Sequence, residues 1–207
     1  MKKIISISNQ KGGVGKTTTT INLATSLAAV KKNVLIVDAD PQGNASTGLG
    51  LTHNDRKPSI YEMIHEKKLL KDGIKETLIP GLKIIGANTD LAAAEVELTN
   101  FENREFVFKS IFDEIDNFDF IFVDCPPALG LLTINSLVAS NTTLIPLQSE
   151  FFALEGITQL VKTIDRIKVN LNPSLSVRGI LLTMFDKRNK LSSQVDKEAR
   201  NYFKEKV

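Results

Sequence analysis

The sequence predicts a single α/β domain in which a doubly wound, mainly parallel β-sheet is flanked by helices. Three observations support this fold class. Short apolar runs alternate along the chain with segments of helical periodicity, and each run is apolar on successive residues instead of on every second one. A glycine-rich loop joins the first run to the first helical segment. Continuous apolar runs are typical of parallel strands buried on both faces, and their alternation with helices is typical of βαβ units.

The expected elements follow one another without a repeat, a low-complexity tract or a linker. Prolines fall between them, where they remove no regular hydrogen bond. The chain is therefore expected to form one domain over residues 1–207. The predicted strands are Ile4–Ser8, Val34–Val37, Leu82–Ile85, Phe120–Val123, Thr143–Leu147 and Val177–Thr183. The predicted helices are Lys16–Val30, Ile60–His65, Leu91–Glu97, Arg104–Ile115, Gly130–Ala139, Leu154–Val169 and Ser192–Phe203.

Composition narrows the class of protein. The 207 residues are enough for one sizeable core, and 42% hydrophobic with 24% charged residues is typical of a globular chain, not a disordered one. Cys125 is the only cysteine, which excludes an internal disulfide and any site with two cysteine ligands from one chain. No stretch approaches the roughly 20 apolar residues of a membrane-spanning helix. We therefore expect a soluble, cytoplasmic protein that does not bind membranes.

Charge is spread unevenly along the chain. The net charge is +2, but the residues from Lys162 onward carry +6 and the first 161 residues carry −4. A basic C-terminal part is consistent with a polyanionic partner such as DNA. A solvated helix face is the alternative, and on charge alone it is favoured.

The segment between the first strand and the first helix has the spacing of a phosphate-binding loop. Its glycines let backbone N–H groups approach phosphate oxygens at a helix N-terminus. Lys16 is placed to reach the β- and γ-phosphates, and the Thr17 hydroxyl is placed to coordinate Mg²⁺. A chance glycine-rich turn is the alternative, but the flanking strand and helix argue against it. The predicted ATP-binding residues are Lys11, Gly12, Gly13, Val14, Gly15, Lys16, Thr17 and Thr18.

Acidic residues follow two of the predicted strands. Asp38 and Asp40 come after Val34–Val37, and Asp124 comes after Phe120–Val123. In open α/β sheets ligands bind beyond the carboxyl ends of the strands, so these carboxylates are expected near the phosphate loop. Asp124 is the natural candidate to hold Mg²⁺ through water, and Asp40 to orient or deprotonate the attacking water. The predicted metal-site residues are Thr17, Asp124 and Asp38, and the predicted catalytic residues are Lys16 and Asp40, to which the family resemblance described below adds Lys11.

The loop departs from the common phosphate-loop pattern in a specific way. Gln10 stands where the first glycine is expected, and Lys11 precedes the glycine pair. This is the K-G-G-x-G-K-[ST] pattern of the deviant Walker A proteins. Across essentially the whole chain, four further segments resemble the ParA family, most closely the chromosomal Soj proteins. These segments are Asp38–Gly48, Asp124–Thr133, Pro146–Gly156 and Gly179–Arg188.

The resemblance implies an ATPase that partitions chromosomes or plasmids. It implies that ATP with Mg²⁺ drives formation of a homodimer, that the dimer binds DNA without sequence preference, and that a ParB/Spo0J-type partner stimulates hydrolysis. In the family the lysine that matches Lys11 reaches the partner subunit's nucleotide, and a side chain at Gly12 is expected to block dimerisation. Arg188 matches an arginine that contacts DNA, with Lys187 and Lys190 as neighbours. The protein would then associate with the nucleoid.

The sequence argues against some other members of the loop family and leaves two as alternatives. Nitrogenase iron proteins and iron–sulfur scaffold ATPases need more than one cysteine per chain, and an arsenite pump ATPase needs two nucleotide domains. A MinD-like positioning ATPase would bind membrane through a C-terminal amphipathic helix, for which no clear counterpart is visible. An ATP-dependent ligase of the cobyrinic acid or dethiobiotin synthetase kind would act on a small substrate.

The resemblance also implies a shortened C-terminal end. Family members continue beyond the position of Val207 with a strand, a loop that helps hold the adenine base and a closing helix. An inactive, truncated nucleotide-binding module is therefore a further alternative. No cis arginine finger is evident, so hydrolysis is expected to be slow without a partner.

Overall fold

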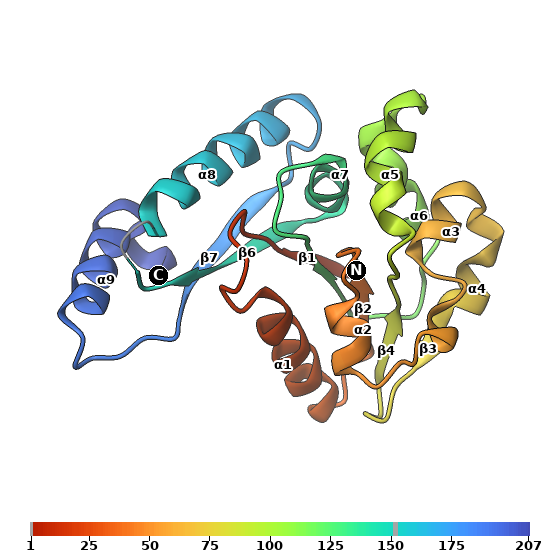
Figure 1. The fold of residues 1–207 in the computed structure, drawn as a ribbon, viewed down its shortest axis with the longest axis horizontal. Coiled ribbons are helices and arrows are strands. Elements are labelled where there is room, and N and C mark those ends of the chain that lie inside the picture. The colour runs from red at the N-terminus through yellow and green to blue at the C-terminus, as the bar shows by residue number, and fades with distance from the viewer. Residues whose placement is uncertain (1, 151–152) are drawn as a thin grey trace.

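The computed structural model describes residues 2–150 and 153–207. In this part of the chain a seven-stranded sheet has the order β3-β4-β2-β5-β1-β6-β7 (Figure 1). All neighbouring strands are parallel except β3, which is antiparallel to β4. The strands are β1 (Lys3–Ile7), β2 (Val34–Asp38), β3 (Ile74–Glu76), β4 (Leu82–Ile85), β5 (Phe120–Asp124), β6 (Thr142–Gln148) and β7 (Ser176–Thr183).

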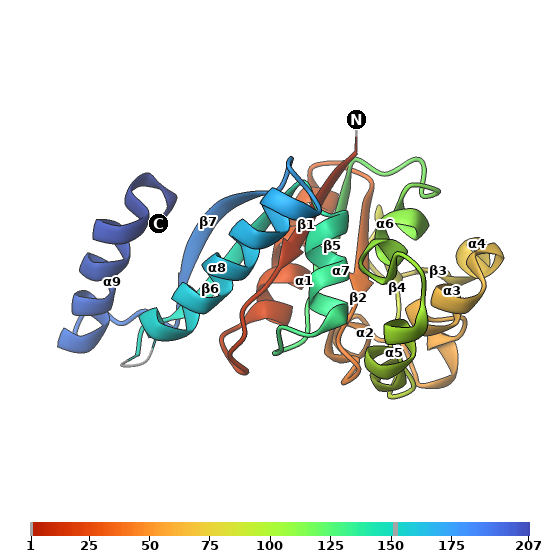
Figure 2. The same cartoon turned by 90° about the horizontal axis from the view of Figure 1, so that it is seen from above.

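Helices cover both faces of the sheet (Figures 1 and 2). Helix α1 lies on one face, and α7 and α8 lie on the other. The helices are α1 (Lys16–Ala29), α2 (Asn44–Gly48), α3 (Ile60–His65), α4 (Leu70–Gly73), α5 (Leu91–Glu97), α6 (Val107–Phe112), α7 (Leu131–Ala139), α8 (Ala153–Asn170) and α9 (Lys190–Phe203). Within the described residues, none of them combines the length and the apolar character needed to cross a bilayer.

The predicted strands are confirmed to within one residue at each end. One strand was not predicted. Ile74–Glu76 carries two charged residues in three, so the sequence shows no apolar run there, and the segment pairs only at the edge of the sheet through β4. An antiparallel edge strand can leave its polar side chains in water, which is why its pattern is weak.

The predicted helix Arg104–Ile115 is wrong in its continuity. The chain forms a short 3₁₀ turn at Arg104–Phe106 and only then enters α6. Asn135 on α7 explains the break, because its amide group donates to the Arg104 carbonyl at 2.8 Å and accepts from the Phe108 N–H at 3.1 Å. A side chain from a distant segment therefore takes backbone groups at the helix start, which no local pattern reveals.

The sheet brings the carboxyl ends of its central strands together. β5 lies between β1 and β2, so that Ile7 and Asp38 both pair with Asp124 in register. Strand β2 is buried along its whole length, as expected for the middle of a doubly covered sheet. The loops that follow β1, β2 and β5 therefore meet at one edge, where a ligand site is expected.

Candidate nucleotide-binding site

The loop between β1 and α1 has the backbone of a phosphate cradle. Gly13 and Gly15 have φ angles of 73° and 86°, in the left-handed region that favours glycine, and Gly15 caps the N-terminus of α1. The Lys16 ammonium donates a hydrogen bond to the Lys11 carbonyl at 2.9 Å, so the lysine folds back along the loop. Lys16 is buried, and this burial lowers its pKa. A positive charge and the first N–H groups of α1 thus meet in one concave loop.

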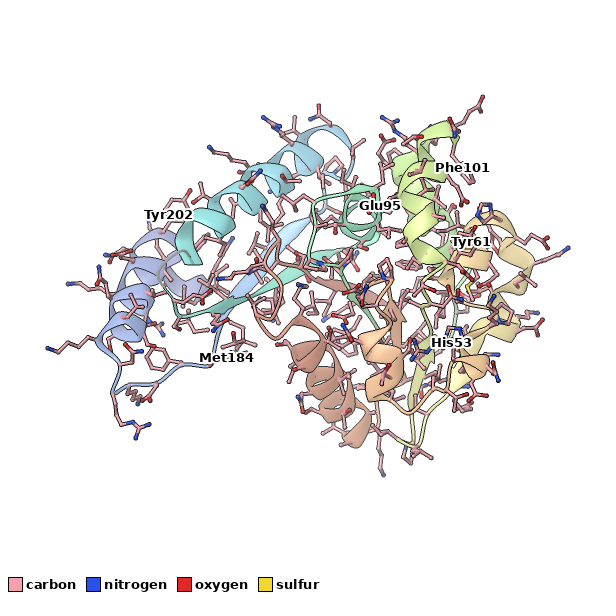
Figure 3. The ribbon with its side chains drawn as sticks, in the orientation of Figure 1. His53, Tyr61, Glu95, Phe101, Met184 and Tyr202 are labelled. Atoms are coloured by element: carbon pink, nitrogen blue, oxygen red, sulfur yellow. The ribbon has the colours of Figure 1, made fainter. Side chains whose placement is uncertain are left out.

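A cavity of about 330 Å³ opens over this loop. It combines residues of the loop with residues from the β2–α2 and β5–α7 loops and from the end of β7. Gln42, Asn44, Pro127 and Met184 were not predicted as site residues. Met184, labelled in Figure 3, follows β7, far along the chain from the loop that it approaches. The lining residues are Gly12, Gly13, Gly15, Lys16, Thr17, Thr18, Asp40, Gln42, Asn44, Pro127 and Met184.

Two predicted loop residues lie outside the cavity lining. Val14 is buried, and its carbonyl accepts a hydrogen bond from the Thr183 hydroxyl at 2.9 Å, which ties the loop to β7. The Lys11 side chain is 44% exposed and forms an ion pair with Glu150, two residues beyond the end of β6. Glu150 belongs to the segment Pro146–Gly156 that carried the family resemblance, of which residues 151 and 152 lie outside the described residues.

Asp124 lies directly beneath the start of α1. Its carboxylate accepts hydrogen bonds from the Thr17 hydroxyl at 2.7 Å and from the Thr20 hydroxyl at 3.1 Å. Burial raises the pKa of Asp124 to about 7, and the nearby Asp38 acts in the same direction. Thr20 was not singled out from the sequence, although its position three residues after Thr17 places it on the same helix face. The pair Thr17–Asp124 presents a hydroxyl and a carboxylate of the kind that hard cations such as Mg²⁺ prefer.

The two aspartates after β2 have different surroundings. Asp40 lines the cavity, and its Oδ1 atom accepts a hydrogen bond from the Gln42 N–H at 3.0 Å. Asp38 is fully buried, and its Oδ2 atom accepts from both the Ser46 N–H and the Ser46 hydroxyl at 2.8 and 2.7 Å. Burial raises the pKa of Asp38 to about 6. Asp38 therefore holds α2 against the end of β2, and its part in metal binding stays a prediction.

Protein side chains alone do not supply a full set of ligands for the predicted metal ion. Among residues 2–150 and 153–207, no group of three or more His, Cys, Asp or Glu side chains gathers as a ready metal centre. Mg²⁺ in nucleotide sites usually keeps several waters and binds one or two protein groups together with phosphates. The Thr17 hydroxyl and the Asp124 carboxylate fit that incomplete donor set.

The predicted DNA-contacting residues lie apart from the cavity lining, near the turn between β7 and α9. Lys187, Arg188 and Lys190 are all exposed. The Arg188 side chain is 91% exposed, and its guanidinium donates to both carboxylate oxygens of Asp186 at 3.1 and 2.8 Å. These three cations are therefore accessible to solvent, and their contact with DNA stays a prediction.

Comparisons with known proteins agree with this geometry. A family described as AAA domain matches residues 2–177. The chain is 50% identical to the chromosome partitioning protein ParA of Myxococcus xanthus, over 99% of this chain and 73% of that protein. It is 47% identical to the sporulation initiation inhibitor protein Soj of Bacillus subtilis, over 100% of this chain and 82% of that protein.

Solved structures share the fold over nearly the whole chain. A protein from Mycobacterium smegmatis titled cobyrinic acid a,c-diamide synthase, with bound ADP and magnesium, superposes with a TM-score of 0.93 at 34% identity, covering 99% of this chain and 83% of that one. A putative plasmid partition protein of Borrelia burgdorferi bound to AMPPNP gives a TM-score of 0.84 at 28% identity, covering 97% and 81%. With its phosphate loop, its mainly parallel sheet and its full-length likeness to ParA and Soj, the chain belongs to the ParA/Soj family of partitioning ATPases.

Proposed function

We propose that this protein is an ATP-dependent switch that partitions chromosomes or plasmids. In this proposal, Mg·ATP drives homodimer formation, the dimer binds DNA without sequence preference, and a ParB-type partner stimulates hydrolysis. The observation that carries the proposal is the cavity lined by the left-handed glycines, the buried Lys16 and Thr17, whose hydroxyl donates to the buried Asp124 carboxylate. Neighbouring structures that contain ADP or an ATP analogue with magnesium support the same ligand.

The residues of the cavity have distinct tasks in this reaction. The loop N–H groups and Lys16 bind the phosphate oxygens, and Lys16 offsets the charge that develops on the transferred phosphoryl group. The Thr17 hydroxyl and the ionised Asp124 are the protein groups that would hold Mg²⁺, and the ion would neutralise part of the phosphate charge. Asp40 lines the cavity beyond the loop, where its carboxylate can orient a water molecule for attack.

Lys11 is proposed to act on a second subunit. Its side chain does not line its own cavity, forms an ion pair with Glu150 and is half exposed. Gly12 lines the cavity at the same rim, and a Cβ atom there would meet only the Pro127 Cβ at 3.9 Å, an ordinary contact. A partner subunit that approached this rim would therefore contact the Lys11 side chain and the Gly12 backbone, which carries no side chain.

DNA binding is proposed for the exposed basic residues of the C-terminal part. Arg188, Lys187 and Lys190 belong to the region that carries +6. Non-specific binding rests on phosphate neutralisation, with Kd of roughly 10⁻⁴–10⁻⁶ M at physiological salt. Two copies in one dimer double the number of phosphate contacts, so retention on DNA becomes dependent on ATP.

A gel-shift experiment on DNA of unrelated sequence tests these steps together. Wild-type protein should shift DNA with ATP and not with ADP or without nucleotide. Lys16→Ala should abolish the shift by loss of phosphate binding, and Arg188→Ala should weaken it while Mg·ATP binding in calorimetry is retained. Lys109→Ala, which removes an exposed lysine paired with Asp113 on another surface, is the matched control and should behave as wild type. A wild-type protein that ignores Mg·ATP in calorimetry would refute the proposal.

The structural likeness to the protein titled cobyrinic acid a,c-diamide synthase keeps a small-molecule ligase as the second candidate. Relatives named as partitioning proteins at 45–50% identity favour the switch over it. The two differ in what accelerates hydrolysis. Stimulation by cobyrinic acid with a nitrogen donor, and none by DNA with a ParB-type partner, would establish the ligase instead.

A further inference from the structure

A carboxylate from α5 caps the N-terminus of α7. The Glu95 carboxylate accepts hydrogen bonds from the Leu131 N–H at 2.7 Å and from the Leu132 N–H at 3.1 Å. Figure 3 shows Glu95 beside α7. The N-cap residue of α7 is Gly130, which has no side chain to offer, and the first turn of α7 contains no acidic residue. Glu95 therefore supplies from another helix both the acceptor and the negative charge that a helix N-terminus favours.

The contact depends on the absence of a side chain at residue 130. A Cβ atom built on Gly130 would lie 2.5 and 2.6 Å from the two carboxylate oxygens of Glu95. The Gly130 φ of −84° is one that any residue adopts, so glycine is not needed there for backbone conformation. Glycine is favoured at residue 130 because a side chain there would occupy the space that the Glu95 carboxylate fills.

Helix α7 follows directly after the loop that begins beyond Asp124 and fixes the C-terminal end of that loop. This loop, residues 125–130, begins at the end of β5 and carries Pro127 into the lining of the nucleotide cavity. Its two prolines, Pro126 and Pro127, have no N–H group with which to tie the backbone down. The loop is held at its start by the Cys125 N–H, which donates to the Ile7 carbonyl at 3.3 Å, and near its end by the Thr133 hydroxyl, which donates to the Ala128 carbonyl at 2.6 Å. The Glu95 contact then fixes where α7 itself begins.

We propose that Glu95 is a positioning residue of the nucleotide site: by capping α7 it holds the loop 125–130, and with it Pro127 and the end of β5, in the place that the bound nucleotide requires. The effect on hydrolysis rests on the proposed function, whereas the effect on the loop does not.

The reactivity of Cys125, the only cysteine of the chain, measures opening of the loop directly, because Cys125 is the first residue of the loop. The thiol is 1% exposed, and burial raises its pKa to about 12, so the folded protein should react slowly with the thiol reagent DTNB. Local opening of the loop would expose it. At a temperature well below Tm, Glu95→Gln should speed labelling by about tenfold, as expected when a hydrogen bond to a charged group is lost.

Glu97→Gln is the matched control, since it makes the same change on the same helix. Glu97 contacts Tyr61 and His65 of α3, each at 3.1 Å, and does not touch α7. Its labelling rate should stay at the wild-type value. Gly130→Ala should reproduce the effect of Glu95→Gln, because the new Cβ displaces the carboxylate, which is the free end of a flexible side chain. The double variant should label no faster than the faster single variant, since both remove one contact.

Hydrolysis supplies the second readout. With ATP and the stimulating partner, Glu95→Gln should lower kcat by about tenfold with little change in KM, and Glu97→Gln should leave both unchanged. Wild-type labelling rates in both Glu95→Gln and Gly130→Ala would overturn the proposal. Faster labelling with unchanged kcat would overturn the positioning role. If the wild-type protein hydrolyses no ATP, the proposed function fails, and the labelling comparison still decides whether Glu95 holds the loop.

Discussion

At the scale of single residues, the site contains more buried carboxylates than buried cations, since Asp38, Asp40 and Asp124 are all buried beside the buried Lys16. Asp38 and Asp124 are fully buried, and burial raises the pKa of Asp38 to about 6 and that of Asp124 to about 7. Hydroxyl and N–H donors from Thr17, Thr20 and Ser46 offset only part of this cost. The nucleotide-free protein therefore holds a site that is poised to take up positive charge.

The raised pKa of Asp124 predicts a pH dependence of stability. The folded protein binds this proton more tightly than the unfolded chain, so the stabilising contribution is present below about pH 4 and is lost as pH rises through about 7. Asp124→Asn should remove this loss and raise the free energy of unfolding at pH 8, without nucleotide or Mg²⁺, by up to a few kcal/mol. Urea unfolding at pH 5 and pH 8 measures it. The exposed Asp113→Asn is the control, and an equal pH effect in wild type and Asp124→Asn would contradict the assignment.

The glycines of the phosphate loop predict different outcomes at adjacent positions. Gly12→Val should leave nucleotide binding near the wild-type level, because a Cβ atom there meets only the Pro127 Cβ at 3.9 Å, but it should prevent the ATP-dependent dimer. Gly13→Val should weaken nucleotide binding itself, since Gly13 has a φ of 73° and a β-branched residue there is strained by about 1–3 kcal/mol. Sedimentation with ATP and calorimetry separate the two. A Gly12→Val protein that forms a stable ATP dimer would refute the predicted interface.

At the scale of elements, α7 is tied at both ends by side chains from other segments. Glu95 caps its N-terminus, and the Asn172 amide donates to the carbonyls of Leu137, Val138 and Ser140 at its C-terminus, at 3.2, 2.9 and 2.8 Å. The last carbonyls of a helix have no intrahelical partner, so this amide satisfies groups that would otherwise be orphaned. Helix α7 is thereby fixed between α5 and the turn that leads into β7.

Asn172→Ala should therefore lower the free energy of unfolding by about 1–3 kcal/mol, because the Val138 and Ser140 carbonyl oxygens lose this donor while Leu137 keeps only the Ser140 N–H. Asn170→Ala is the matched control. The Asn170 side chain is exposed and donates only to the Arg166 carbonyl within its own helix, so its loss should cost less than about 0.5 kcal/mol. Thermal and urea unfolding of the two variants measure the difference. Equal destabilisation would show that the α7 carbonyls do not depend on Asn172.

Elements with a strong local pattern were predicted well, and those that depend on distant contacts were not. The central strands and the long helices α1 and α8 have apolar periodicity sufficient to locate them within a residue. The short helix α2 is held by Ser46 and Asp38, and the start of α6 is set by Asn135. Such elements are specified by hydrogen bonds between segments that lie far apart in the sequence, and a local pattern does not contain them.

At the scale of the whole molecule, the charge asymmetry of the chain becomes a spatial one. The basic C-terminal part forms the β7–α9 side of the molecule, beyond the phosphate loop at one end of the sheet (Figure 2). The exposed cations there are separate from the lining of the nucleotide cavity. The proposed DNA site is therefore distinct from the proposed nucleotide site, and in the proposal the ATP-dependent dimer couples the two.

This arrangement predicts the salt dependence of DNA binding. If Arg188 neutralises one phosphate in each subunit, Arg188→Ala should reduce the slope of log Kobs against log salt concentration by about 2 for the dimer. The affinity should fall equally for DNA of any sequence. Lys109→Ala should leave the slope unchanged. Titrations at several salt concentrations, with ATP held in excess, measure the slope. An unchanged slope in Arg188→Ala would place the DNA contact elsewhere.

The sequence by itself determined the fold class, the phosphate loop and the family, because glycine spacing, apolar runs and strand-end aspartates are local patterns that report directly on backbone geometry. It also predicted roles for Asp40, Thr17 and Asp124, and these roles stay predictions. Only the tertiary structure decided that Met184 and Pro127 complete the cavity, that Asp38 is engaged with Ser46, and that Glu95 caps α7. Each of these depends on which strands are neighbours and on which helices lie side by side. That information resides in the packing of segments distant in the chain, not in any one of them.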